Sequence, residues 1–113
     1  MITGNCLCEK ISFEAEEIPG MVFNCHCSRC RKSHGSAFST QVITQKSSLK
    51  FLKGRYFLSE YEVNGMVRAY CSHCGSRLMN YAKQTEYLSI SISAINNRAD
   101  LKPIGECFIA DKL

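Results

Sequence analysis

The sequence lacks any apolar run long enough to cross a membrane, and its first ten residues show neither a basic start nor an apolar stretch. A secretory leader needs both of those features, and a spanning helix needs about 20 apolar residues. We therefore expect a cytoplasmic protein without a membrane partner. Thiols stay reduced in that compartment, so abundant cysteine favours metal binding over disulfides.

Basic residues are too scattered to suggest a nucleic-acid partner. The chain has 14 Lys and Arg against 10 Asp and Glu, a formal net charge of +4, and its tightest basic group is Arg29, Arg31 and Lys32. Nucleic-acid binding proteins usually carry a dense basic stripe. We expect no nucleic-acid partner and a mild attraction for anionic small molecules.

Internal repeats, low-complexity tracts and linkers are also missing from the sequence. A length of 113 residues is that of one ordinary domain. A hydrophobic fraction of 45% allows a small core, and cross-links are expected to help at this size. We expect a single domain over residues 1–113.

Helical periodicity is weak, whereas strand-like alternation recurs along the chain. Between 87 and 93, leucine and isoleucine alternate strictly with polar residues, mostly serine. Asn64-Gly65 between two alternating runs predicts a hairpin, because both central residues of a type I′ turn need positive φ. We predict a mainly β fold of two or three small antiparallel sheets, with one helical turn at 28–33. The predicted strands cover 10–14, 21–24, 37–44, 49–52, 56–63, 66–70, 77–82, 87–93 and 107–110.

Eight cysteines are far more than a chain of this length ordinarily carries. Seven of them fall into three short motifs, and Cys107 stands alone. The motifs are Cys6-x-Cys8, Cys25-x-Cys27-x-x-Cys30 and Cys71-x-x-Cys74-Gly75.

The Cys71-x-x-Cys74-Gly75 motif is a strong metal signal. Two intervening residues let both sulfurs approach one ion at about 2.3 Å, and the glycine permits the tight turn that follows. A second pair must complete the tetrahedron, and Cys6 and Cys8 are the natural candidates. These four cysteines predict a closed structural zinc site.

The remaining motif places Cys25, Cys27 and Cys30 close together in the sequence. Three protein ligands with an open fourth position are typical of a catalytic zinc. The motif therefore predicts a second zinc ion in a catalytic site. A second structural site, closed by Cys107 or a histidine, is an alternative interpretation.

Other interpretations of these residues stay open. A disulfide scaffold would allow 105 pairings of eight cysteines, but the absence of a secretory start disfavours it. His26 and His73 lie inside the metal loops, where we expect them to face solvent and not to act as permanent ligands. We expect His34 at the surface or in a pocket, and Cys107 as a buried core thiol in a strand.

The motifs together resemble the glutathione-dependent formaldehyde-activating enzyme family, also called the centromere-protein-V-like family. The resemblance runs from Gly4 to about Lys112, with the three motifs in the family's order. It rests on Gly4-x-Cys6-x-Cys8, Cys25-His26-Cys27-x-x-Cys30-Arg31-Lys32-x-x-Gly35-Ser36-Ala37-Phe38 and Cys71-x-x-Cys74-Gly75-Ser76-x-Leu78.

The resemblance implies an all-β fold similar to the Mss4-like fold, with a structural zinc on the four-cysteine set and a labile zinc on the three-cysteine set. It also implies a carbon–sulfur lyase type of activity, in which glutathione and formaldehyde form S-hydroxymethylglutathione. The chain departs from the family in having no C-terminal Pro-Trp segment, since it contains no tryptophan.

A mechanism follows if a substrate thiol enters the open position at Cys25, Cys27 and Cys30. Zinc would hold it as a thiolate that adds to an aldehyde, and zinc or Arg31 would stabilise the developing oxyanion. The neighbouring Arg29 and Lys32, with Arg31, would attract a carboxylate-bearing thiol such as glutathione. Two non-enzymatic alternatives are a zinc-binding module for protein interaction and a thiol or zinc sensor. A concave pocket at the three cysteines would favour the enzyme.

Overall fold

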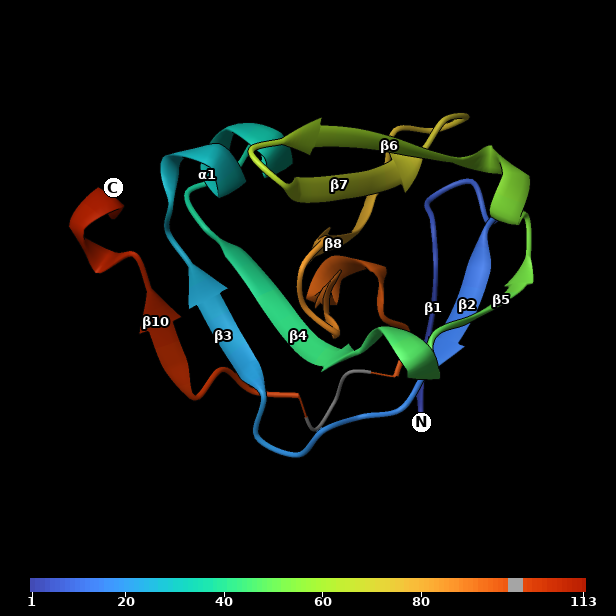
Figure 1. Cartoon of the computed structure of the whole chain (residues 1–113), viewed down its shortest axis with the longest axis horizontal. Helices are drawn as coiled ribbons and strands as arrows, with labels where there is room; N and C mark the ends of the chain where they lie inside the picture. Colours follow the sequence, from blue (N-terminus) through green and yellow to red (C-terminus); the bar gives the residue numbers. More distant parts are fainter. Residues whose placement is uncertain (98–100) are drawn as a thin grey trace.

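The protein is described by a computed structural model that covers residues 1–97 and 101–113. It is mainly β, with one short α-helix, as the sequence predicted (Figure 1). The strands are β1 (Ile2–Asn5), β2 (Ser12–Ala15), β3 (Val22–Cys25), β4 (Ser39–Gln45), β5 (Lys50–Lys53), β6 (Leu58–Val63), β7 (Met66–Cys71), β8 (Arg77–Ala82), β9 (Tyr87–Ser91) and β10 (Gly105–Cys107). The helices are α1 (Ser28–His34) and the 3-10 turns η1 (Lys46–Ser48), η2 (Arg55–Phe57), η3 (Ile92–Ala94) and η4 (Ile109–Asp111).

The strands form two sheets. One has three strands in the order β1-β2-β5, and the other has seven in the order β10-β3-β4-β9-β8-β7-β6. In Figure 1 the small sheet lies at one side of the molecule, and β3, β4 and β10 lie at the other. All described pairings are antiparallel except that of β10 with β3, which is parallel and corrects our antiparallel prediction at this edge.

The hairpin between β6 and β7 forms where the sequence predicted it. Asn64 has φ 52° and Gly65 has φ 81°, the two positive values that a type I′ turn needs. Val63 and Met66 face each other across the turn, and this register continues to Leu58 opposite Cys71. The hairpin therefore fixes the position of the strand that leads into the Cys71 motif.

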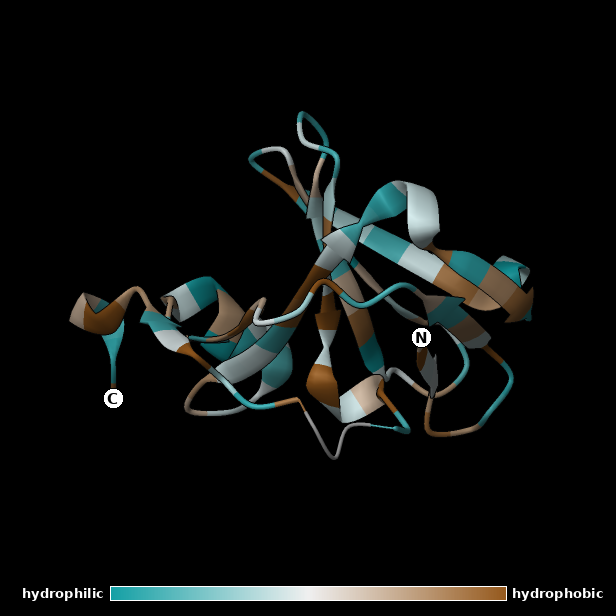
Figure 2. Cartoon of the chain, turned by 90° about the horizontal axis from the view of Figure 1, so that it is seen from below, coloured by the Kyte–Doolittle hydropathy of each residue, from teal (hydrophilic) through white to brown (hydrophobic). Residues whose placement is uncertain are grey.

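The hydrophobic core takes side chains from both sheets. It includes Ile2 and Phe13 from the small sheet and Leu78, Leu88 and Ile90 from the large one, each no more than 2% exposed. Figure 2 shows that many strands alternate between polar and apolar residues, and that the apolar C-terminal segment lies away from this core. One face of each sheet is thus buried against the other.

Several boundaries differ from the predicted ones. Strand β1 was not predicted from the sequence. It contains Gly4, where a Cβ would overlap the carbonyl oxygen of Ala94 and the ring of Phe13. The strand predicted at 107–110 is instead β10, which ends at Cys107, followed by η4. The first residues of the strand predicted at 56–63 belong to η2, and the last residues of the strand predicted at 87–93 belong to η3.

Candidate functional site

The larger cluster brings together two cysteine pairs that are far apart in the sequence: Cys6 and Cys8, and Cys71 and Cys74. Their sulfur atoms all lie within 4.8 Å of one another. The Sγ atoms of Cys6 and Cys8 are 3.5 Å apart, and those of Cys8 and Cys71 are 3.8 Å apart. The loop after β1 and the loop after β7 meet here, so the site joins the two sheets.

Backbone and hydroxyl contacts hold these four thiols in place. Gly75 has φ 79° and donates its N–H to the carbonyl oxygen of Cys71 at 2.8 Å, which closes the turn of the motif. Ser76 Oγ lies 3.2 Å from Cys74 Sγ and accepts the Leu7 N–H at 2.9 Å, so it links the two ligand loops. Cys6 and Cys71 belong to the hydrophobic core.

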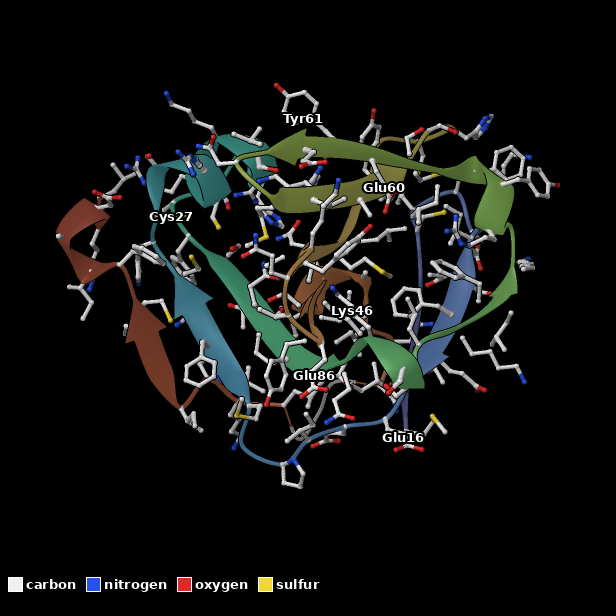
Figure 3. All side chains as sticks on the ribbon, viewed as in Figure 1. Glu16, Cys27, Lys46, Glu60, Tyr61 and Glu86 are labelled. Atoms are coloured by element: carbon white, nitrogen blue, oxygen red, sulfur yellow. The ribbon has the colours of Figure 1, made fainter. Side chains whose placement is uncertain are left out.

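Cys25, Cys27 and Cys30 form the second cluster, with sulfur atoms again within 4.8 Å of one another. Cys25 ends β3, and Cys27 is the N-cap of α1, where its Sγ accepts the Cys30 N–H at 3.3 Å. The Sγ atoms of Cys25 and Cys30 are 3.3 Å apart. The strand end and the first turn of the helix therefore aim all three sulfurs at one point (Figure 3 labels Cys27).

Both clusters fit a zinc ion. Sulfurs about 2.3 Å from a tetrahedral metal lie about 3.8 Å apart. The separations of 3.5 Å and 3.8 Å in the larger cluster are close to this value, and the 3.3 Å between Cys25 and Cys30 is somewhat shorter. In the smaller cluster, burial raises the pKa of Cys25 to about 12. Burial also opposes ionisation of Cys27, yet hydrogen bonds from Cys30 bring the pKa of Cys27 below its ordinary value. Without a cation the thiols therefore ionise unequally, and a metal among them would favour three thiolates.

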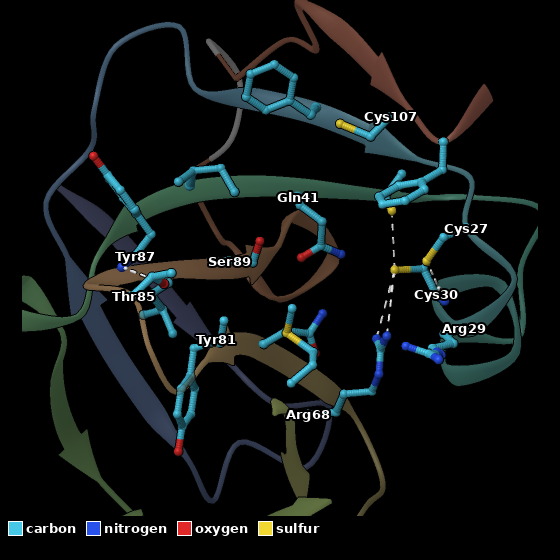
Figure 4. Close-up of a pocket in the computed structure, with 18 of the residues that line it drawn as sticks. Cys27, Arg29, Cys30, Gln41, Arg68, Tyr81, Thr85, Tyr87, Ser89 and Cys107 are labelled. Carbon is cyan, nitrogen blue, oxygen red and sulfur yellow. Dashed lines mark hydrogen bonds between the residues drawn. The ribbon is translucent and has the colours of Figure 1, made fainter. Parts of the chain in front are cut away.

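A buried arginine faces the smaller cluster. Arg68 lies on β7 and is 7% exposed. Its Nη1 and Nη2 atoms lie 3.9 Å and 4.0 Å from Cys30 Sγ (Figure 4). A guanidinium at this distance offsets the negative charge that three thiolates bring.

An imidazole–carboxylate pair fastens β10 to the loop of this cluster. His26 is 3% exposed, and its Nε2 lies 2.7 Å from Glu106 Oε1. Asn24 Nδ2 donates to Glu106 Oε2 at 2.8 Å, and the His26 N–H donates to the Cys107 carbonyl at 3.0 Å. The His26 contact, followed by that of Asn24, lowers the pKa of Glu106. His26 is therefore a buried clamp and not the solvent-facing residue we expected, although it does not join the cluster as a ligand.

A cavity of about 560 Å³ opens beside the smaller cluster (Figure 4). Its wall includes Cys25, Cys27 and Cys30 together with Arg68. The floor is a face of the large sheet on which buried polar side chains gather, among them Gln41 and Asn80 at 5% exposure each. The aromatic residues Phe23, Tyr81, Tyr87 and Phe108 line its remaining sides.

The three cations predicted to attract substrate, Arg29, Arg31 and Lys32, differ in their position relative to the cavity. Arg29 is exposed and lines the cavity, while Lys32 is exposed and does not line it. Arg31 is half-buried, and its Nε donates to the His26 carbonyl at 3.2 Å. Arg31 thus braces the loop, and Arg68 is the arginine that faces the sulfurs.

Three further residues had predicted positions: Cys107, His73 and His34. Cys107 is half-buried at the end of β10 and lines the cavity, so our prediction of a core thiol is wrong. His73 is exposed. His34 lines a second cavity of about 570 Å³, and burial, followed by Arg77 and Arg68, lowers its pKa to about 4.

The sequence did not indicate Arg68, Gln41 or Asn80 as site residues. Each occupies a polar position in an alternating strand, where a solvent-facing side chain is the ordinary expectation. The cavity reverses this expectation, because one polar face of the sheet points into it. Nothing in the local sequence distinguishes such a face from one that faces water.

Comparison with known proteins identifies the family. The sequence matches the family described as glutathione-dependent formaldehyde-activating enzyme over residues 1–111. The chain belongs to this family. Its motifs and the two cysteine clusters that form from them agree with the resemblance seen in the sequence.

A solved structure has a similar fold. A crystal structure of a Rhodobacter sphaeroides protein superposes with a TM-score of 0.73 and 22% sequence identity, covering 92% of this chain and 98% of the other. At that identity the likeness concerns the fold. No curated protein matches the sequence. Within the described residues, no helix combines the length and apolar character needed to cross a membrane.

Proposed function

We propose that this chain is an enzyme that combines a small-molecule thiol, glutathione first, with formaldehyde. The observation that carries the proposal is the cavity beside the smaller cluster, whose wall contains Cys25, Cys27 and Cys30. None of the four thiols of the larger cluster lines this cavity, which supports a purely structural role for them. We assign a structural zinc to the larger cluster and a catalytic zinc to the smaller one.

The reaction forms a bond between the thiol sulfur and the carbonyl carbon, and it transfers the thiol proton to the carbonyl oxygen. It needs no oxidant or reductant, and its reverse is the carbon–sulfur lyase reaction. Zinc, when bound by Cys25, Cys27 and Cys30, supplies a positive centre that lowers the pKa of a nearby thiol. The exposed cation Arg29 at the cavity attracts a carboxylate-bearing thiol.

We assign stabilisation of the developing oxyanion to Arg68 in place of Arg31. Arg68 is buried in the cavity wall against Cys30, whereas the Nε of Arg31 is engaged with the His26 carbonyl. A guanidinium in a site shielded from water stabilises new negative charge more strongly than an exposed one. Arg31 then acts as a positioning residue for the cysteine loop.

The cavity supports an enzyme over a module for protein interaction. A cavity of about 560 Å³ with three metal-binding thiols in its wall suits a small-molecule ligand, and a module for protein interaction does not need one. The eight free thiols support a reducing compartment, and we propose the cytoplasm.

The test measures formation of S-hydroxymethylglutathione by NMR with zinc-loaded protein, above the uncatalysed rate. We expect acceleration by the wild type, none by Cys27→Ser, and heat of binding when glutathione is titrated into the wild type. The control variant is Cys107→Ser, which removes a cavity thiol outside the three-cysteine set. No acceleration and no heat at millimolar glutathione, with both clusters loaded, would overturn the proposal.

A further inference from the structure

Gln41 presents a buried amide to the cavity with nothing bound to either end. The residue is 5% exposed, and neither its Nε2 nor its Oε1 has a hydrogen-bond partner within the described part of the chain. A buried donor and acceptor without partners destabilise the folded state, so native proteins rarely leave both unpaired. Such a side chain in a cavity wall points to a ligand that completes its hydrogen bonds.

The strand register explains why Gln41 faces inward. Gln41 and Ile43 are two residues apart on β4, so they project from the same face, and both line the cavity. Ser91 lies opposite Gln41 on β9, and its Oγ is also buried without a partner. Figure 4 shows the amide of Gln41 between Ser89 and the cysteines. Of these two residues with unpaired polar atoms, Gln41 is the one that lines the cavity.

The chemistry of an amide restricts what can pair with it. Gln41 offers one acceptor and one donor group next to each other. A carboxylate has only acceptors and would leave Oε1 unpaired, while an ammonium group has only donors and would leave Nε2 unpaired. An alkyl chain would satisfy neither. A peptide group, with a carbonyl and an N–H, is complementary to both.

We propose that Gln41 is a specificity-determining residue that binds a peptide group of the thiol substrate, so that the enzyme selects peptide-like thiols over alkyl thiols. The inference rests on the proposed function of the same cavity. It adds the part of the substrate that the cavity floor recognises, at a distance from the reacting sulfur. Asn80, also in the floor, has its Oδ1 taken by Arg77 at 3.1 Å, which leaves Gln41 as the side-chain amide with both ends available.

The experiment compares two thiols that differ only in the peptide group. Mercaptoacetylglycine and 5-mercaptopentanoate each have four chain atoms between the sulfur and the carboxylate, but only the first has an amide. Calorimetric titration gives the affinity of zinc-loaded wild type, Gln41→Met and Gln45→Met for each thiol. Gln45 is the matched control, because it is exposed on the same strand and does not line the cavity.

We expect the wild type and Gln45→Met to prefer mercaptoacetylglycine by about tenfold or more, and Gln41→Met to lose this preference. Gln41→Met should also melt at a higher temperature than the wild type without ligand, because it removes two unpaired polar atoms from the interior. As a measurement on the wild type alone, the side-chain amide NMR signals of Gln41 should move when mercaptoacetylglycine binds.

Contrary results separate the two proposals. Equal affinity of the wild type for both thiols, a preference kept in Gln41→Met, or Gln41 signals that do not move would overturn the role of Gln41 and leave the enzyme proposal standing. A wild type that binds neither thiol nor glutathione would overturn both. If Gln41→Met does not fold, the NMR signals of the wild type decide the question.

Discussion

The two cysteine clusters contain the same donor atom but differ in their surroundings. In the larger cluster, Cys6 and Cys71 are 3% and 0% exposed and belong to the core. In the smaller one only Cys30 is buried, and all three cysteines line the cavity of about 560 Å³, whereas of the larger cluster only Cys6 borders the second cavity. Because the ligand type is the same, this difference in surroundings is what supports the proposed structural role of the larger cluster and the proposed reactive role of the smaller one.

The two clusters also differ in the length of chain between their ligands. Cys8 and Cys71 are 63 residues apart, whereas Cys25 and Cys30 are five apart. Holding distant segments together removes much more freedom from the unfolded chain than closing a single turn. A metal in the larger cluster therefore stabilises the whole fold, and a metal in the smaller one stabilises a local loop.

Loss of the larger cluster should have the largest effect. We expect Cys71→Ser to unfold the protein, because structural zinc contributes about 10–16 kcal/mol in small zinc domains, as much as a whole domain's stability. Circular dichroism and zinc content per chain check this. A Cys71→Ser protein that melts cooperatively and keeps two zinc ions would contradict the structural assignment.

Loss of the smaller cluster should leave the fold intact. We expect Cys27→Ser to lose one zinc ion and thiol binding, with little change in melting temperature, because serine can still cap α1 in place of the Cys27 sulfur. Cys107→Ser, as the control, should keep both ions. A Cys27→Ser protein that melts as early as Cys71→Ser would remove the contrast between the clusters.

Arg68 tests whether charge near the smaller cluster matters to the reaction. We expect Arg68→Met to lower kcat by about 100-fold while the zinc content stays at two, the size of effect seen when one oxyanion donor is lost. Arg68→Lys should recover part of the rate. Arg31→Met should lower it less, since Arg31 contacts the backbone of the loop. The opposite order of the two methionine variants would return the oxyanion role to Arg31.

A smaller effect should come from His34, the last residue of α1, whose protonation in acid should lower the stability of the fold. The pKa of His34 falls from its ordinary value of 6.5 to about 4 in the folded state, so the unfolded chain binds more protons between these values. Stability should therefore fall as the pH drops from about 6.5 towards 4. The effect is about 1 kcal/mol, because the partly exposed ring is screened by solvent.

Denaturant unfolding at pH 7 and pH 5 measures this contribution. His34→Gln should lose less stability over the interval than the wild type, whereas His73→Gln, an exposed control, should follow the wild type. Metal loss on acidification affects all three proteins alike. Equal losses for wild type and His34→Gln would show that the clusters alone carry the acid sensitivity.

Local signals in the sequence were sufficient for part of this structure. The Asn64-Gly65 turn formed as predicted, and β8 begins and ends where alternation indicated, at Arg77 and Ala82. Both depend on neighbours in sequence. The membership of the cysteine sets could also be proposed from spacing, since C-x-x-C motifs bring their own sulfurs together.

The sequence could not reveal what depends on distant partners. Strand β10 is placed by the pair His26–Glu106, whose members are 80 residues apart. The cavity floor was missed because alternation gives two faces without saying which one meets water. Gln41 and Arg68 became recognisable only when the curved sheet brought them to the same hollow as Cys30.

The positions of the ligands in the sequence also decide which cluster is completed first during translation. At about 5–20 residues per second, the 63 residues from Cys8 to Cys71 take about 3 to 13 s to synthesise. Cys25, Cys27 and Cys30 emerge together well within that interval. Under the proposed assignment, the nascent chain offers the smaller, reactive cluster to a metal first and the larger, structural cluster last. The cluster on which the fold depends most is then the last one to be completed during translation.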